Sequence, residues 1–214
     1  MKHLAYILTL IVLSGCVSKT VQHSEENENA NNISNNEIVK QYKLDSIPFI
    51  SNLRFELDKK SNLNLAKKHM KLTQQQIDFF FSKEEQSQLS EMSEINAYFL
   101  GKRNLRNNQL AVFILCDFDY LGINLYCATL DKNGKLKNKF TPAYLELDAG
   151  YSISGKGEFL NDTTYQLIET CYEYIDYEHK LKKKDYSVKI IAIGLDSTRI
   201  QSERKYPTDT IVER

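Results

Sequence analysis

The order of hydrophobic and polar residues divides this 214-residue chain into three stretches. An apolar run over residues 4–13 follows a short basic start. Residues 17 to about 40 are rich in Ser, Asn, Glu and Gln with almost no apolar content, so this stretch should be disordered. From about residue 41 the apolar positions recur with the periods of helices and strands, which predicts a single folded domain over residues 41–214.

A helical period governs the segment that starts at Thr73. This residue is a good N-cap, and Gln76 completes a capping box three positions later. The same spacing recurs at Ser82, so two short helices are expected, near residues 74–81 and 83–92. The first helix carries an apolar stripe that should face the core, made of Ile77, Phe80 and Phe81.

The period changes to two from about residue 94, which indicates strands. Residues 110–118 are apolar at odd and even positions alike, so they should form a central strand covered on both faces. Residues 180–184 suggest a charged loop. Because the connections are too short for helical crossovers, the strands should form an antiparallel meander. The other expected strands lie near residues 46–57, 97–100, 123–130, 143–148, 151–160, 164–175, 187–195 and 198–205.

These elements predict an α+β fold class, with short N-terminal helices packed on the antiparallel β-meander. The meander could be a curled sheet, a barrel or a pair of small sheets, and the sequence does not choose among them. The strongest hairpin signal is Lys132-Asn133-Gly134-Lys135, because Asn-Gly accepts the positive φ of a type I′ turn.

Two cysteines of the meander have a specific expected placement. If Leu121-Gly122 forms a two-residue turn, Tyr120 pairs with Ile123, and Cys116 then lies directly opposite Cys127. Opposed strand positions have Cβ atoms about 4.5–5.5 Å apart, which is wider than a relaxed disulfide needs. We therefore expect two adjacent thiols, and the sequence leaves their disulfide state open.

Composition narrows the range of functions. The chain has 28 basic and 28 acidic residues, so it lacks the basic excess that binds nucleic acid, and no nucleic-acid partner is expected. The sequence contains no nucleophile motif and no metal-ligand spacing, so we expect no cofactor and no metal. The many tyrosines could form a face for a protein or glycan partner, and the absence of Trp counts mildly against the glycan.

The first apolar run ends in Leu13-Ser14-Gly15-Cys16. A basic start, a short apolar run and small residues are the three parts of a secretory signal, and the run is too short to span a bilayer. These four residues resemble the lipobox of bacterial lipoproteins. The resemblance implies cleavage after Gly15 and a diacylglycerol on the thiol of Cys16.

The same resemblance implies a signal peptide over residues 1–15, a lipidated disordered tether over residues 16–40 and a lipid anchor in a cell membrane. Val17 stands where an Asp would indicate retention in the inner membrane, which favours the outer membrane. The domain should then face the periplasm or the cell surface.

Four carboxylates are candidates for chemistry. Asp117 and Asp119 share one face of their predicted strand, and Glu169 and Glu173 share a face of another. If these strands were neighbours, the side chains could form an acidic patch for a cation or for acid–base catalysis. The alternative is that they are the solvated face of half-buried strands.

Four short motifs, each an Asp followed by Ser or Thr and a small or apolar residue, resemble acceptors for periplasmic O-glycosylation. Asp-Ser and Asp-Thr are also ordinary turn formers. The hydroxyls that would be modified belong to Ser46, Thr163, Ser197 and Thr210.

The chain resembles small envelope lipoproteins of Gram-negative bacteria. We expect a non-enzymatic binding or interaction module of the cell envelope. The alternative is a hydrolase or a ligand-sensing enzyme that uses the carboxylates of the sheet.

Overall fold

The computed structural model of the protein describes residues 37–51, 53–58, 70–90, 96–118, 122–148, 150–194 and 197–212. The predicted signal peptide, Cys16 and most of the predicted tether lie outside these residues. The elements in chain order are α2 (Glu37–Gln41), the 3₁₀ helix η1 (Leu44–Ser46), β1 (Arg54–Phe55), α4 (Gln74–Phe80), α5 (Lys83–Ser90), β2 (Asn96–Leu105), the 3₁₀ helix η2 (Arg106–Asn108), β3 (Gln109–Asp117), β4 (Gly122–Leu130), β5 (Leu136–Asp148), β6 (Tyr151–Asn161), β7 (Thr164–Asp176), β8 (Leu181–Ile193), β9 (Thr198–Lys205) and β10 (Asp209–Val212).

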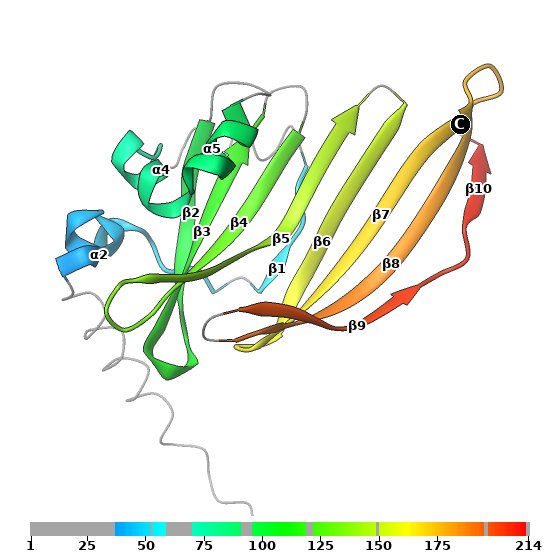
Figure 1. Ribbon diagram of the computed structural model, residues 1–214. Coiled ribbons are helices and arrows are strands. Elements are labelled where there is room, and N and C mark those ends of the chain that lie inside the picture. The colour runs from blue at the N-terminus through cyan, green and yellow to red at the C-terminus, as the bar shows by residue number, and fades with distance from the viewer. Residues whose placement is uncertain are drawn as a thin grey trace, which may run out of the picture.

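The described strands form one antiparallel sheet in which β2 to β8 follow one another as a meander (Figure 1). In addition, β1 pairs with β6, and β9 and β10 both pair with β8. The predicted antiparallel meander is confirmed. The sheet is not closed, so the barrel and the pair of small sheets are wrong. The helices are few and short, so the α+β description holds only in part.

The edge of β2 that faces away from β3 is covered by an earlier segment of the chain. A covered edge has no free backbone groups to pair with another strand, so the sheet need not close to protect it. The backbone N–H of Ile50 donates to the carbonyl of Lys102, and the N–H of Lys102 donates to the carbonyl of Pro48, both at 2.9 Å. The strand expected over residues 46–57 is therefore mostly this edge segment, and only its end forms β1.

The two predicted helices are confirmed, with both caps. The hydroxyl of Thr73 accepts from the backbone N–H of Gln76, whose side chain accepts from the N–H of Thr73. Ser82 and Glu85 form the same reciprocal pair at the start of α5. In Figure 1, α5 lies over the upper part of β2 and β3, and α4 lies beside β2.

Strand β3 is buried on both faces, as its apolar sequence predicts. Val112, Ile114 and Cys116 belong to one core cluster together with Phe80 of α4. Phe113 belongs to the second cluster, on the opposite face. Every residue of β3 is buried.

The domain begins earlier than residue 41. Val39 of α2 is 1% exposed and packs in the helix-side cluster, together with Leu44 of η1. The buried ammonium of Lys102 donates to the carbonyls of Leu44 and Asp45, at 2.9 and 2.8 Å. The last residues assigned to the tether are thus part of the folded domain.

Strand β5 turns a corner halfway along its length. Its first half pairs only with β4, and its pairing with β6 begins at Tyr144. The corner coincides with Pro142, which has no N–H to give to a ladder, and with a register shift against β4 between Leu125 and Cys127. The part of β6 that β5 no longer pairs with is paired with β1.

The corner brings the two halves of the sheet together around aromatic rings. Phe113 and Phe140 each contact Phe159, with ring centroids 6.2 and 6.3 Å apart. Tyr165 contacts Phe159 and donates a buried hydrogen bond of 2.8 Å to the carbonyl of Pro142. We call these rings the aromatic cluster: Phe55, Phe113, Phe140, Phe159 and Tyr165.

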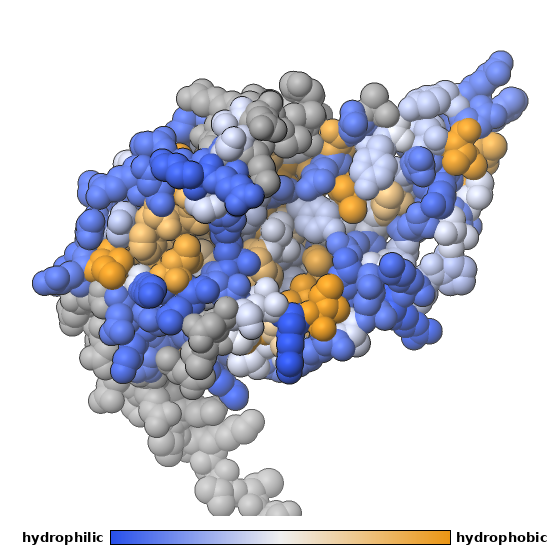
Figure 2. Space-filling view, viewed as in Figure 1, coloured by the Kyte–Doolittle hydropathy of each residue, from blue (hydrophilic) through white to orange (hydrophobic). Residues whose placement is uncertain are grey.

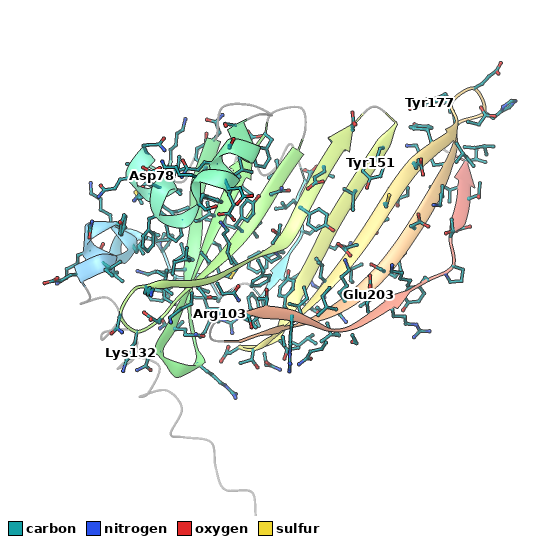
Figure 3. The ribbon with its side chains drawn as sticks, viewed as in Figure 1. Asp78, Arg103, Lys132, Tyr151, Tyr177 and Glu203 are labelled. Carbon is teal, nitrogen blue, oxygen red and sulfur yellow. The ribbon has the colours of Figure 1, made fainter. Side chains whose placement is uncertain are left out.

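An ion pair joins the same two halves at their surface. Arg103 of β2, labelled in Figure 3, lies 2.8 Å from Asp162 in the turn between β6 and β7. Arg106 adds a second contact at 3.4 Å. In the strand order, β3, β4 and β5 lie between β2 and β6. Arg103 of β2 can therefore reach the turn after β6 only because the sheet folds over.

The expected adjacency of Cys116 and Cys127 is wrong. Asp117 pairs with Ile123, so the connection is longer than two residues, and Cys127 lies opposite Phe113. The two cysteines therefore belong to clusters on opposite faces of the sheet. Both are free thiols, and burial raises the pKa of each. The supposed turn residue 121 lies outside the described residues.

Two turn predictions need correction. The hairpin at residues 131–135 is confirmed, but only Gly134 has positive φ, at 73°, so the turn is not type I′. The side chain of Asp131 caps it by accepting from the N–H groups of Asn133 and Lys135. The charged loop expected over residues 180–184 is mostly strand, because these lysines pair with β7 at the start of β8.

Replacing Tyr165 by Phe should lower the free energy of unfolding by about 1–3 kcal/mol, because the carbonyl of Pro142 stays buried without its donor. Urea denaturation measures this change. Tyr177, which is 65% exposed, provides the matched control, and Tyr177→Phe should change stability by less than about 0.5 kcal/mol. Equal midpoints for the two variants would contradict the role of the corner.

Candidate binding site

Beyond the corner, β6, β7 and β8 form a single layer. Residues 181–190 of β8 are all half-buried, whereas every residue of β3 is buried. Figure 1 shows that β7 and β8 curve strongly, and that α4 and α5 do not cover them. Away from the buried aromatic cluster, side chains on this half of the sheet are therefore open to solvent or to a partner.

A groove of about 430 Å³ lies on this single layer. It is bordered by β6, β7, β8 and the β9–β10 edge. Figure 2 shows that apolar side chains on the visible face form small separate groups among polar ones. The lining of the groove mixes charged and aromatic side chains, and it includes Glu169, Cys171, Asp185, Lys189, Glu203 and Tyr206.

Glu169 of β7 is the centre of a side-chain network in this groove. Its carboxylate accepts hydrogen bonds from the phenol of Tyr144 and from the hydroxyl of Ser187, and it pairs with the ammonium of Lys189. The side chains of Glu169 and Lys189 are only 17% and 21% exposed. Lys189 also lies 3.9 Å from Glu203 of β9, so the network joins four strands.

A glycine makes this network possible. In the sheet register, Gly155 of β6 lies between Tyr144 of β5 and Glu169 of β7. A Cβ atom at Gly155 would lie 2.3 Å from a ring carbon of Tyr144. The ring can therefore cross β6 to reach the carboxylate only because position 155 has no side chain.

The network shifts the pKa values of Glu169 and Tyr144 in opposite directions. Burial acts to raise the pKa of Glu169, but the hydrogen bonds from Lys189 and Tyr144 outweigh it and hold that pKa below its ordinary value. Burial and the hydrogen bond to Glu169 raise the pKa of Tyr144. Glu169 is thus a stabilised carboxylate and a weak base, so it is poorly suited to activate the hydroxyl of Ser187.

The four carboxylates singled out in the sequence are not brought together as one patch. Asp117 on β3 and Glu169 on β7 are separated in the sheet by β4, β5 and β6. Asp117 is buried, and Asp119 lies outside the described residues. Glu173 is exposed on β7, between Tyr151 of β6 and Lys183 of β8.

The predicted glycosylation acceptors Ser46, Thr163, Ser197 and Thr210 are all exposed. Asp162, next to Thr163, is engaged by Arg103, and Thr210 lies in β10 rather than in a tail. Modification of the four hydroxyls stays a prediction.

Sequence reasoning identified Glu169 but missed its partners. Ser187 and Lys189 occupy alternate positions on β8, a spacing that places both side chains on one face. That pattern was visible in the sequence, but pairing it with Glu169 requires the register between β7 and β8. The contact between Tyr144 and Glu169 could not be predicted from the sequence, because it crosses the intervening strand β6.

No protein-family model matches the chain, and neither the curated proteins nor the solved structures give a match. None of the described helices is long and apolar enough to cross a membrane. Within the described ranges, no group of three or more His, Cys, Asp or Glu side chains is placed to hold a metal ion.

Replacing Glu169 by Gln should lower the free energy of unfolding at about pH 7 by about 1–3 kcal/mol, because the half-buried ammonium of Lys189 loses its carboxylate. The pKa of Glu169 is lowered on folding, so its contribution is complete above the ordinary value of 4.5 and is lost as the pH falls through the folded-state pKa. The difference between wild type and variant should therefore shrink at about pH 3.

Urea unfolding at the two pH values measures both effects. The exposed Glu173 lies on the same strand, and Glu173→Gln should change stability by less than about 0.5 kcal/mol. A difference between wild type and Glu169→Gln that does not vary with pH would disprove the electrostatic role of the network.

Proposed function

We propose that the chain is a membrane-anchored lipoprotein whose folded domain is a non-enzymatic binding module of the cell envelope. The observation that carries the binding role is the open groove on the single-layer half of the sheet. Glu169, Lys189 and Glu203 in this groove form one ion-pair network, and the rim is formed by the exposed β9–β10 edge. Such a surface suits contact with a partner better than it suits bond cleavage.

The anchor is supported by the lipobox resemblance at Leu13-Ser14-Gly15-Cys16. The described part of the domain begins at α2, so residues 17–36 lie between it and the lipidated cysteine in the chain. As a flexible coil these residues would span roughly 25 Å. That reach would hold the groove close to the membrane and still allow the domain to turn.

Two features speak against the alternative of a hydrolase. Asp117 lies on β3, which is not a neighbour of β7, the strand that carries Glu169 and Glu173. Glu169, which does line the groove, is ionised and accepts hydrogen bonds from three side chains. A general acid or base needs a pKa near the working pH, and this environment moves the pKa in the other direction.

We favour a protein segment as the partner. Tyr206 lines the groove at 39% exposure and contacts Tyr186, and tyrosines of this kind are common anchors at protein interfaces. The absence of Trp makes a stacked glycan the weaker choice.

The anchor is tested by Cys16→Ser. The variant should lose lipid labelling and remain an unprocessed or wrongly processed precursor, because the thiol that carries the diacylglycerol is gone. Cells grown with labelled palmitate and then fractionated give both readouts. A wild-type protein without label, or with a mature N-terminus elsewhere than Cys16, would disprove the anchor.

The binding role is tested by placing a photo-crosslinking phenylalanine analogue at Tyr206 in cells that make the protein. Light should produce an adduct of one defined mass, whose peptide content mass spectrometry identifies. The same analogue at Leu160, which is 51% exposed outside the groove, is the control and should give no such adduct. Identical patterns from both positions, or no adduct from Tyr206, would contradict binding at the groove, and an adduct that contains only sugar would identify a glycan.

A further inference from the structure

The register of β6 to β9 assigns each side chain of the single layer to one of its two faces. Successive side chains of a strand point to opposite faces, and directly paired residues share a face. Glu169, Ser187 and Lys205 are paired in this way across β7, β8 and β9, and all three line the groove. We call this side the groove face, and Tyr151 and Glu203, labelled in Figure 3, belong to it.

The opposite side, which we call the back face, carries apolar and aromatic side chains outside the core. Pairing places Ile168 beside Val188, and Tyr172 beside Lys184. The apolar and aromatic side chains of this face are half-buried, and neither core cluster of the described chain includes them. They include Ile168, Tyr172, Tyr174, Val188 and Ile190.

The back face is basic. Its carboxylates are Glu56, which pairs with Lys156 at 2.9 Å, Glu158, which pairs with Arg54 at 3.1 Å, and Asp209, which lies opposite Lys184 in the register. The basic side chains of this face outnumber them. They are Arg54, Lys156, Lys182, Lys184, Arg199 and Arg204.

The groove face has the opposite balance of charge. Glu146 and Asp148 of β5 share it, because they are paired with Ile153 and Tyr151 of β6. On β7 to β9 it carries Glu169, Glu173, Asp185 and Glu203, together with Lys183, Lys189 and Lys205. The single layer is therefore electrically polarised, with an acidic groove face and a basic back face.

Charge and composition together indicate what covers the back face. A second copy of the chain would bring two basic surfaces into contact, which is unfavourable. An anionic phospholipid surface attracts lysine and arginine, and tyrosine is enriched where a membrane meets water. Long basic side chains can cover apolar surface while their charged ends reach the lipid phosphates. Lys182 already lies over the ring of Tyr174, at 4.2 Å from its centroid.

We propose that the back face lies on the surface of a membrane that contains anionic phospholipid. The lipid anchor proposed above keeps this surface within reach, and the inference rests on that anchor for this proximity. Lipid phosphates repel the acidic groove face. Docking of the back face therefore turns the groove away from the membrane, toward the partner that it binds.

The absence of Trp from the chain allows a single reporter of orientation to be introduced. Tyr172→Trp places it on the back face, and Tyr151→Trp places it on the groove face of the neighbouring strand. The lipidated protein is reconstituted into phosphatidylcholine vesicles with or without phosphatidylglycerol. The acyl chains carry bromine, which quenches Trp fluorescence on contact.

Tyr172→Trp should lose emission in the vesicles with phosphatidylglycerol and regain it at high salt, because salt screens the attraction. Tyr151→Trp should keep its emission in both. Equal quenching of the two reporters, or none at Tyr172→Trp, would overturn the proposal. Thermal denaturation checks folding, and Tyr174→Trp on the same face replaces Tyr172→Trp if that variant does not fold.

Adjacent lysines of β8 provide a matched pair of variants. In the Tyr172→Trp protein, Lys184→Gln should lower the ratio of docked to undocked protein roughly fivefold, since it removes one charge near the lipid. Lys183→Gln removes the same charge from the groove face and should leave the ratio unchanged. Equal effects of the two substitutions would contradict docking by the back face.

Two further measurements separate this proposal from its neighbours. Flotation with vesicles of phosphatidylcholine alone reports the anchor, and protein that floats only when phosphatidylglycerol is present would disprove the anchor but support the docking face. A photo-crosslinking phenylalanine analogue at Tyr174 in cells should give a phospholipid adduct. An adduct with another protein would assign the back face to an acidic protein partner and overturn the proposal.

Discussion

The corner of β5 at Pro142 is the constraint on which the rest of the structure depends. A proline cannot donate to a sheet ladder, so the strand leaves β6 at this point, and β1 pairs with β6 in its place. The carbonyl of Pro142 is held by the phenol of Tyr165, from a strand that β5 does not pair with. One backbone position therefore bends the sheet, and one side chain from β7 fixes the bend.

The bend divides the sheet into a covered half and an uncovered half. The helices are fastened to the covered half through Lys139, whose ammonium donates to the carbonyl of Phe80, pairs with Glu85 at 2.6 Å and lies over the ring of Phe81. Away from the aromatic cluster, no described helix covers the other half. There the side chains of the strands are joined by the polar network at Glu169. The charged groups of this network are only partly desolvated, and their hydrogen bonds can offset the cost of that desolvation.

This division leaves the groove on the uncovered half of the sheet. The groove contains the ion-pair network of Glu169, Lys189 and Glu203 and has an exposed rim, which suits contact with a macromolecule.

The sequence by itself determined the features that depend on neighbouring residues. The capping boxes at Thr73 and Ser82, the helices they start, the doubly buried strand β3 and the antiparallel order of short strands all follow from local spacing and hydrophobic period. The tertiary structure alone decided the corner at Pro142, the opposite faces of Cys116 and Cys127, and the partners of Glu169. Each of these depends on strand register or on contacts between residues far apart in the chain. Because side chains alternate between the faces of a sheet, a small change in register changes which residues meet, and the hydrophobic pattern leaves the register open where a strand is apolar on both faces.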